Sequence, residues 1–318
     1  MWISPYKYVL SLGHLCSDIN QSILSAVLPF LIATYHYDYT TAAMLVTVSN
    51  VFGAFVQPFI GMLSDKKNKL LYMTLGVLLA SGGMAVTGFI SNFFGLCIVV
   101  IISGIGVVMF HPQAAKLVNS VSSKNAKGKG MSIFSFGGKV GFTLGPVYTA
   151  FLMNLFGMKG TILFLIPGIV FGIVCSFFNK DFENLDVLEV EKKEKVKSEQ
   201  KDDWSGFIKL CCVVFSRSIL SNGISTFLAF YFIQQFSKSN SFASMLLSVF
   251  YGIGSITLLG GGIADCFGHR KMVRLSFCIF LPAIFIFTNT SHFVIALIMH
   301  IFMTCGESLS YSPMVVLG

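Results

Sequence analysis

Long runs of apolar residues, separated by short polar stretches, are the feature that most limits how this chain can fold. The clearest run, Phe93–Phe110, contains no charged residue. A helix needs about 20 mostly apolar residues to cross the ~30 Å hydrocarbon core of a bilayer. Ten segments meet this criterion, and they begin near residues 8, 41, 70, 93, 129, 161, 206, 243, 271 and 293. The sequence therefore predicts an all-α, polytopic membrane protein.

The composition supports lipid as the solvent. Hydrophobic residues make up 54% of the chain and charged residues only 11%, whereas about a quarter of a soluble domain is charged. The net charge of +8 is not taken as a sign of nucleic-acid binding, because the basic residues collect in alternate loops. The eight cysteines fall mostly inside apolar runs, without C-x-x-C pairs or neighbouring histidines. We expect no metal site and no cofactor.

The distribution of basic residues predicts the orientation in the membrane. Most of the 22 lysines and arginines fall on the side of the amino terminus, while Lys159 and Lys238 fall on the other side. Because cytoplasmic loops carry the excess of Lys and Arg, we expect a multi-pass protein of the plasma membrane with a cytoplasmic amino terminus. The first apolar run lacks a cleavage site and is expected to remain as a helix.

One long hydrophilic segment divides the chain. Residues 179–205 are rich in Lys and Glu, which predicts a solvated cytoplasmic linker between a six-helix half, 1–178, and a second half, 206–318, with four helices. A regulatory or partner-binding role for this segment is the alternative.

A repeat relates the two halves. The stretch GMLSDKKNK at Gly61–Lys69 recurs as GGIADCFGHRK at Gly261–Lys271, 200 residues later. A parallel duplication of this kind is typical of transporters that bind their solute near the midplane, between the halves. The pattern predicts ten of an expected twelve membrane helices, with the second half incomplete.

These loops resemble the signature of the major facilitator superfamily. The first copy has Gly61 and Asp65 followed by lysines, and the second has Gly261, Asp265 and Arg270. The resemblance implies that these residues form a charge relay at the cytoplasmic face that gates the conformational change. A simple orientation signal is the alternative for the basic residues.

Further segments narrow the resemblance. Gly141, Gly145 and Pro146 resemble a glycine and proline motif of the antiporter branches, which implies a role in gating. The chain is most similar to the fosmidomycin-resistance group of efflux proteins in three segments: Asp18–Leu31, Phe110–Leu117 and Met131–Pro146.

Ionisable residues inside the predicted spans are the candidates for function, because each is costly in lipid. His14, Asp18, Gln21 and Ser25 share one face of the first helix. Similar polar stripes on the fifth, seventh and tenth helices contain Lys139, Arg217 and Glu307, and together they suggest one aqueous cavity.

We interpret Arg217 and Lys139 as the groups that bind an anionic or polar solute, and Asp18 or Glu307 as the group that exchanges a proton. The alternative is that Asp18 only pairs with Lys139 or Arg217 to neutralise charge. His111 precedes Pro112 near the expected end of the fourth helix, so it is interpreted as a cap or a proton relay. The glycines at 137, 138, 141 and 145, and at 260–262, predict close helix packing.

The sequence thus predicts a secondary transporter, acting as a monomer, that exports a small polar, anionic or drug-like solute in exchange for protons. An importer of the same fold and a non-transporting binding or sensor protein are the alternatives. An enzyme is not expected, because neither H-E-x-x-H nor G-x-S-x-G occurs, and no phosphate loop supports ATP-driven transport.

Overall fold

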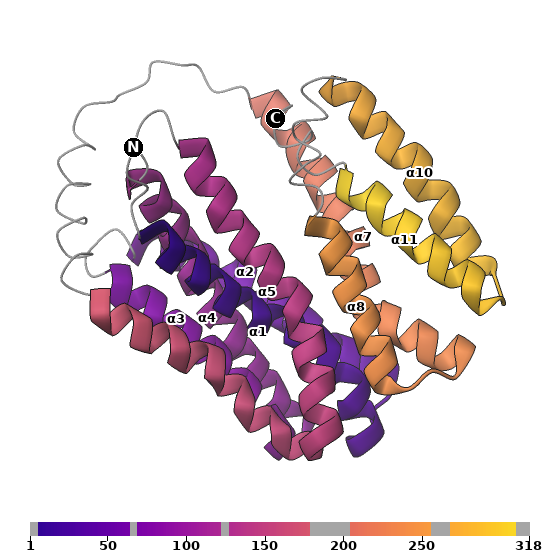
Figure 1. Cartoon of the computed structure of the whole chain (residues 1–318), viewed down its shortest axis with the longest axis horizontal. Helices are drawn as coiled ribbons and strands as arrows, with labels where there is room; N and C mark the ends of the chain where they lie inside the picture. Colours follow the sequence, from indigo (N-terminus) through magenta and orange to yellow (C-terminus); the bar gives the residue numbers. More distant parts are fainter. Residues whose placement is uncertain (1–5, 64–68, 122–126, 179–203, 256–267, 310–318) are drawn as a thin grey trace. The chain divides into compact units, whose positions relative to one another are not determined.

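The structure is a computed structural model that describes residues 6–63, 69–121, 127–178, 204–255 and 268–309, and within these ranges its regular elements are helices (Figure 1). The chain divides into two compact units, Met1–Val196 and Lys197–Gly318. The predicted linker, 179–205, lies outside the described residues except for its last two positions. The boundaries of the three predicted segments therefore stay predictions.

The first unit consists of long helices joined by short connections. Its elements are α1 (Tyr6–Tyr35), α2 (Tyr39–Leu63), α3 (Lys69–Ala85), η1 (Thr87–Phe89), α4 (Phe93–Val121), α5 (Lys127–Phe156), η3 (Gly157–Leu165) and a helix over 166–178. The second unit contains α7 (Trp204–Phe236), α8 (Asn240–Ser255), α10 (His269–Asn289) and α11 (Phe293–Leu309).

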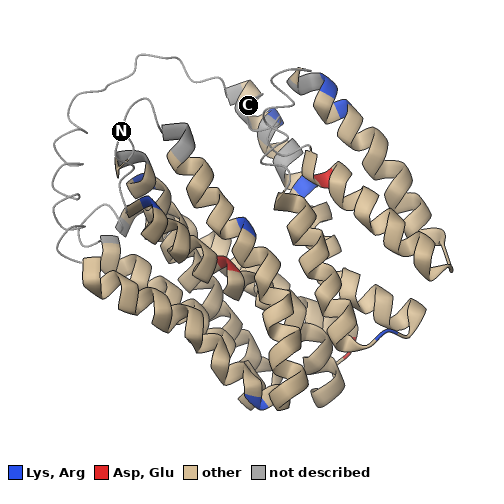
Figure 2. Cartoon of the chain, in the orientation of Figure 1, with Lys and Arg blue, Asp and Glu red and all other residues tan. Residues whose placement is uncertain are grey.

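The helices have the length and composition of membrane spans. Among the described residues, six are long and apolar enough to cross a bilayer: 6–35, 39–62, 70–89, 93–118, 130–178 and 271–289. Charged residues are sparse along most of these helices (Figure 2). The predicted all-α, polytopic class is confirmed, while the count of ten crossings stays a prediction.

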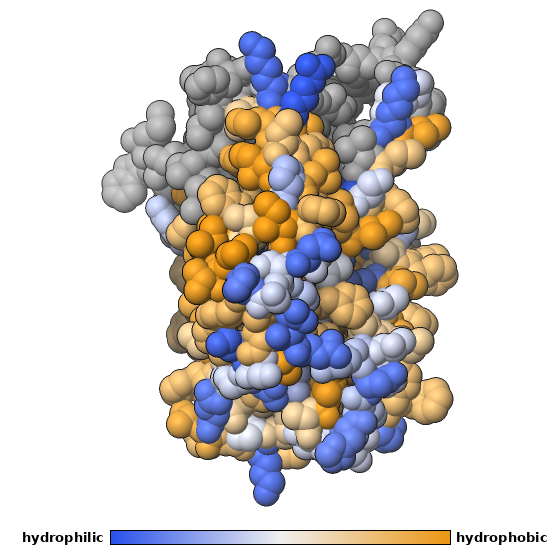
Figure 3. Space-filling view, turned by 90° about the vertical axis from the view of Figure 1, so that its right-hand side faces the viewer, coloured by the Kyte–Doolittle hydropathy of each residue, from blue (hydrophilic) through white to orange (hydrophobic). Residues whose placement is uncertain are grey.

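Large apolar side chains stand on the outside of the units, as lipid contact requires. Phe94 and Phe177 are each 80% exposed, and Met62 is 73% exposed. On the face seen in Figure 3, apolar side chains cover wide areas between groups of hydrophilic ones. In water such a surface would be a binding or aggregation site, whereas in a bilayer it contacts the apolar lipid chains.

The core of the first unit is built around aromatic rings. Phe110 of α4 and Phe171 of the 166–178 helix are fully buried and pack edge to face, with ring centroids 5.8 Å apart. Gly13 of α1 leaves room for both rings, since a Cβ there would lie 2.6 Å from Phe171 and 2.7 Å from Phe110. This core fixes α1 against α4.

Glycines also bring α5 onto α1. A Cβ added at Gly137, Gly141 or Gly145 would collide with Ser11, Leu15 or Ser22 of α1, respectively. The Ser11 hydroxyl donates a 2.8 Å hydrogen bond to the Ile133 carbonyl across the same interface. The close packing predicted from this glycine spacing is therefore confirmed, while residues 260–262 lie outside the described part of the chain.

The turns that follow the first helix of each unit are alike. His36 and Ser237, about 200 residues apart, both have a positive φ, 57° and 51°. Asp38 then accepts a hydrogen bond from the Thr41 backbone N–H, and Ser239 accepts one from that of Phe242. Both are side-chain caps at a helix start, and their spacing agrees with the predicted repeat.

Candidate functional site

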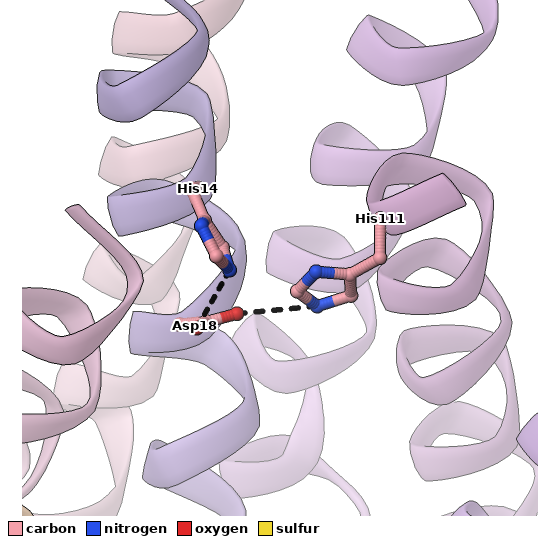
Figure 4. A group of neighbouring side chains, drawn as sticks. All are labelled: His14, Asp18 and His111. Carbon is pink, nitrogen blue, oxygen red and sulfur yellow. Dashed lines mark ion pairs between the residues drawn. The ribbon is translucent and has the colours of Figure 1, made fainter. Parts of the chain in front are cut away.

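Three ionisable side chains meet inside the first unit, at the position of the predicted polar face of α1 (Figure 4). His14 and Asp18 lie one turn apart on α1, and the His14 Nε2 is 3.2 Å from the Asp18 Oδ2. His111 of α4 approaches from the other side, with its Nε2 3.2 Å from the Asp18 Oδ1. We call these residues the His14–Asp18–His111 cluster.

A third helix orients His14. Its Nδ1 lies 2.8 Å from the Phe134 carbonyl of α5, and its ring stacks on the Phe134 ring at 4.0 Å. Because a carbonyl oxygen can only accept a hydrogen bond, Nδ1 must carry the hydrogen. In the protonated ring, Nε2 also carries a hydrogen and donates it to the Asp18 carboxylate, whereas in the neutral ring Nε2 keeps a lone pair that can bind a cation.

The cluster is mostly shielded, with access on one side. The Asp18 side chain is 4% exposed, that of His14 is 14% exposed and that of His111 is 32% exposed. A buried carboxylate is stable only when a cation or donors compensate its charge. His111 is the member through which an ion or water can reach Asp18.

Gly138 of α5 forms one wall of the cluster. A Cβ there would lie 2.5 Å from both the Asp18 Oδ2 and the His14 Nε2. The glycine therefore lets the α5 backbone approach the two side chains directly. Lys139, the next residue, is close enough for its charge to act on His14.

The structure bears on two alternatives that the sequence left open for this region. Pairing of Asp18 with Lys139 or Arg217 was the alternative to proton exchange, and the structure places His14 and His111 beside the Asp18 carboxylate. His111 is not a helix cap, because α4 continues through Pro112 to Val121. Gln21 lies farther along α1 and is exposed.

A second charged pair lies in the other unit. Arg217 of α7 donates through Nη2 to the Glu307 Oε1 of α11, and their side chains are 20% and 10% exposed. These residues were predicted to act separately, one on the solute and one on a proton, but the structure joins them. The first unit has its acid on its first helix and a base on α4, whereas here the base is on α7 and the acid on α11.

The remaining predicted residues divide between described and undescribed positions. Gly61 lies near the end of α2, and Pro146 is inside α5. Asp65, Gly261 and Asp265 lie outside the described residues, and only the backbone of Arg270, in the first turn of α10, is described. Their gating role stays a prediction. His300 is buried, with Nε2 3.3 Å from the Leu246 carbonyl.

Sequence reasoning missed the contribution of α5 to the cluster. The acceptor for His14 is the backbone of Phe134, which residue identity does not reveal. Gly138 was recognised only as a packing residue, although its spacing of four from Phe134 places both on one face of α5. The ligand atoms of the three clustered side chains all lie within 4.8 Å of one another, so they could hold a metal ion.

Comparison with known proteins agrees with this architecture. A model of the Major Facilitator Superfamily matches residues 10–318. The fosmidomycin resistance protein of Escherichia coli is 23% identical over 276 residues, which are 83% of this chain and 66% of that protein. The multi-drug resistance efflux pump PmrA of Streptococcus pneumoniae is 27% identical over 148 residues, 45% of this chain and 36% of the pump.

A solved structure shows the same fold. A bacterial homologue of the human lysosomal transporter Spinster, in an inward-facing and occupied conformation, superposes with a TM-score of 0.81 at 15% identity. The match covers 98% of this chain and 73% of that one. The long apolar helices and the family match are those of a multi-pass membrane protein. The chain belongs to the Major Facilitator Superfamily, and it spans just under two thirds of the length of its fosmidomycin-resistance relative.

Proposed function

We propose that this chain is a secondary transporter that exports a small polar, anionic or drug-like solute in exchange for protons. The observation that carries the proposal is the placement of charge inside apolar helices: Asp18 in α1, and Arg217 with Glu307 between α7 and α11. Placing one charged residue at the centre of a membrane helix costs about 2.5–3.5 kcal/mol on insertion scales. This cost favours a functional role for the charged residues within these helices.

Each charged group has a distinct role in this proposal. Arg217 and Lys139 bind the solute. The guanidinium group of Arg217, which donates to Glu307 in the structure, can donate to an anionic group of the solute instead. Asp18 or Glu307 exchanges the proton, since these are the acidic residues within the described helices. His14, His111 and Gln21 line the route to Asp18, and the amino terminus is cytoplasmic.

The direction of transport is proposed from two supports. The fosmidomycin resistance protein and the efflux pump PmrA are named for resistance and efflux. The α5 stretch with Gly141, Gly145 and Pro146 also resembles an antiporter motif. The glycine and aspartate pairs Gly61 with Asp65 and Gly261 with Asp265, together with Arg270, gate the change between outward and inward opening.

The test is efflux of ethidium and of fosmidomycin from cells that express the chain, with and without a proton uncoupler. Asp18→Asn and Glu307→Gln are compared with wild type, and His36→Gln, in an exposed turn, is the matched control. Export that stops with the uncoupler and in one carboxylate variant supports proton exchange at that residue. Export that survives the uncoupler removes protons from the proposal.

Two alternatives give different results in the same experiment. An importer of the same fold would raise the internal solute concentration when a proton gradient is applied. A protein that binds without transporting would retain solute affinity in purified form, while neither efflux nor uptake depended on Asp18 or Glu307.

A further inference from the structure

We infer that the His14–Asp18–His111 cluster is a binding site for a divalent transition-metal ion, with Zn²⁺ as its best match. The three side chains supply two imidazoles and one carboxylate, a ligand set that zinc accepts with a fourth position left for water or another ligand. The inference rests on side-chain geometry and holds whether or not the chain exports a solute.

The distances between ligand atoms fit a shared metal ion. Zinc bonds of about 2.0–2.1 Å in a tetrahedron place neighbouring ligand atoms about 3.3 Å apart. The His14 Nε2 lies 3.2 Å from the Asp18 Oδ2, and the His111 Nε2 lies 3.2 Å from the Asp18 Oδ1. One ligand atom from each residue lies within 4.8 Å of the others, so binding a single ion needs only a small shift of these side chains.

The hydrogen bonding of His14 is the arrangement expected of a metal ligand. Histidines that bind metals commonly donate their other ring N–H to a carbonyl or carboxylate, which fixes the ring and its tautomer. The Phe134 carbonyl accepts that bond from Nδ1 at 2.8 Å, and the Phe134 ring holds the imidazole plane. The Nε2 lone pair is thereby directed at the centre of the cluster.

An independent observation comes from Asp18. Its Oδ1 is buried, and its polar neighbour among the described residues is the His111 Nε2, 3.2 Å away. A buried carboxylate oxygen needs either a protonated donor or a cation at this position. A cation between Oδ1 and Nε2 would satisfy both atoms.

The charges around the cluster affect its expected affinity for Zn²⁺. A Zn²⁺ ion with one carboxylate leaves a net positive charge, and Lys139 of α5 adds another close to His14. Lys139 should therefore weaken metal binding by repulsion. Where Asp18 is also the carboxylate that exchanges a proton, zinc would compete for it and inhibit export.

The experiment is zinc titration of the full purified chain in lipid nanodiscs, with any affinity tag removed. We expect one Zn²⁺ per chain, at least about tenfold weaker binding in Asp18→Asn and in His111→Gln, and tighter binding in Lys139→Gln. Wild-type affinity should persist in His36→Gln and His292→Gln, which remove exposed histidines elsewhere. Equal affinity in the cluster variants, or loss in either control, would overturn the assignment.

A second measurement does not depend on the folding of those variants. X-ray absorption of the zinc-loaded wild type should show two imidazole ligands and oxygen or nitrogen neighbours near 2.0 Å. His111→Asp, which replaces one imidazole ligand with a carboxylate, should show one imidazole. Fewer than two imidazoles, or a sulfur ligand, in the wild type would refute the site.

Discussion

Gly138 offers the sharpest test of how the cluster is built. In Gly138→Ala the new methyl group would sit 2.5 Å from the Asp18 Oδ2 and the His14 Nε2, well inside van der Waals contact. Both atoms belong to a buried site whose rings are held by Phe134 and Phe110. The methyl group can be accommodated only if α5 moves away from α1 or if the cluster opens.

The magnitude follows from two opposing effects. Alanine favours a helix over glycine by about 0.5–1 kcal/mol, while added volume in a packed interior costs about 1–3 kcal/mol. Gly82 of α3 is the matched control, because a Cβ there meets nothing within 4 Å. We expect Gly82→Ala to be neutral or stabilising, and Gly138→Ala to be less stable than Gly82→Ala by about 1–3 kcal/mol.

Unfolding in mixed micelles of a mild detergent and dodecyl sulfate gives the free energy of unfolding for all three proteins. The same samples should show weakened zinc binding in Gly138→Ala alone. The reasoning is refuted if Gly138→Ala is as stable as Gly82→Ala and binds zinc like the wild type, because α5 would then not pack against the cluster as described.

Three further predictions address other parts of the molecule. Arg217→Gln should lower the free energy of unfolding by about 3 kcal/mol, because it leaves Glu307 buried without its cation. Adding Glu307→Gln should restore part of this lost stability. If the two substitutions instead cause additive losses in a double-mutant cycle, a direct pair is contradicted. Gly13→Ala should cost about 1–3 kcal/mol by pressing on Phe110 and Phe171, and an unchanged unfolding curve would argue against that packing. Hydrogen bonds from Thr41 lower the pKa of Asp38. The charged form of Asp38 therefore stabilises the fold above its unfolded pKa, near pH 4, and this stability is lost as the pH falls. The melting temperature should drop less between pH 6 and 3 in Asp38→Asn than in wild type, and parallel curves of melting temperature against pH would exclude this contribution.

The fold class was predictable because lipid imposes a simple rule on sequence. A span needs a long apolar run, and backbone groups in the bilayer core must bond within a helix. Helices accordingly begin close to the predicted positions, as with α4 at Phe93 and α11 at Phe293. The end of α4 was missed, since the run stops at Phe110 while the helix continues to Val121. Neighbouring helices can support a proline in a membrane helix.

The sequence identified the side chains of the site but did not show which of them contact each other. Helical spacing alone placed His14 and Asp18 on one face of α1. Which helix would face them depends on tertiary packing, and the decisive contacts come from His111 of α4 and a backbone carbonyl of α5. Electrostatic reasoning predicted that the Asp18 carboxylate needs a basic partner. It considered Lys139 and Arg217 for that position, because these side chains are permanently charged and a histidine is not.

The opposite placement of acid and base in the two units has a consequence for how the repeat can change. At the 200-residue offset of the repeat, Asp18 of α1 matches Ser218 of α7, and Arg217, which pairs with Glu307, matches Ser17. A chimera with α7 in place of α1 would remove Asp18 from His14 and His111, and the reciprocal exchange would remove Arg217 from Glu307. Recombination between the two copies would therefore leave charged groups in lipid without their partners, so the copies are no longer interchangeable.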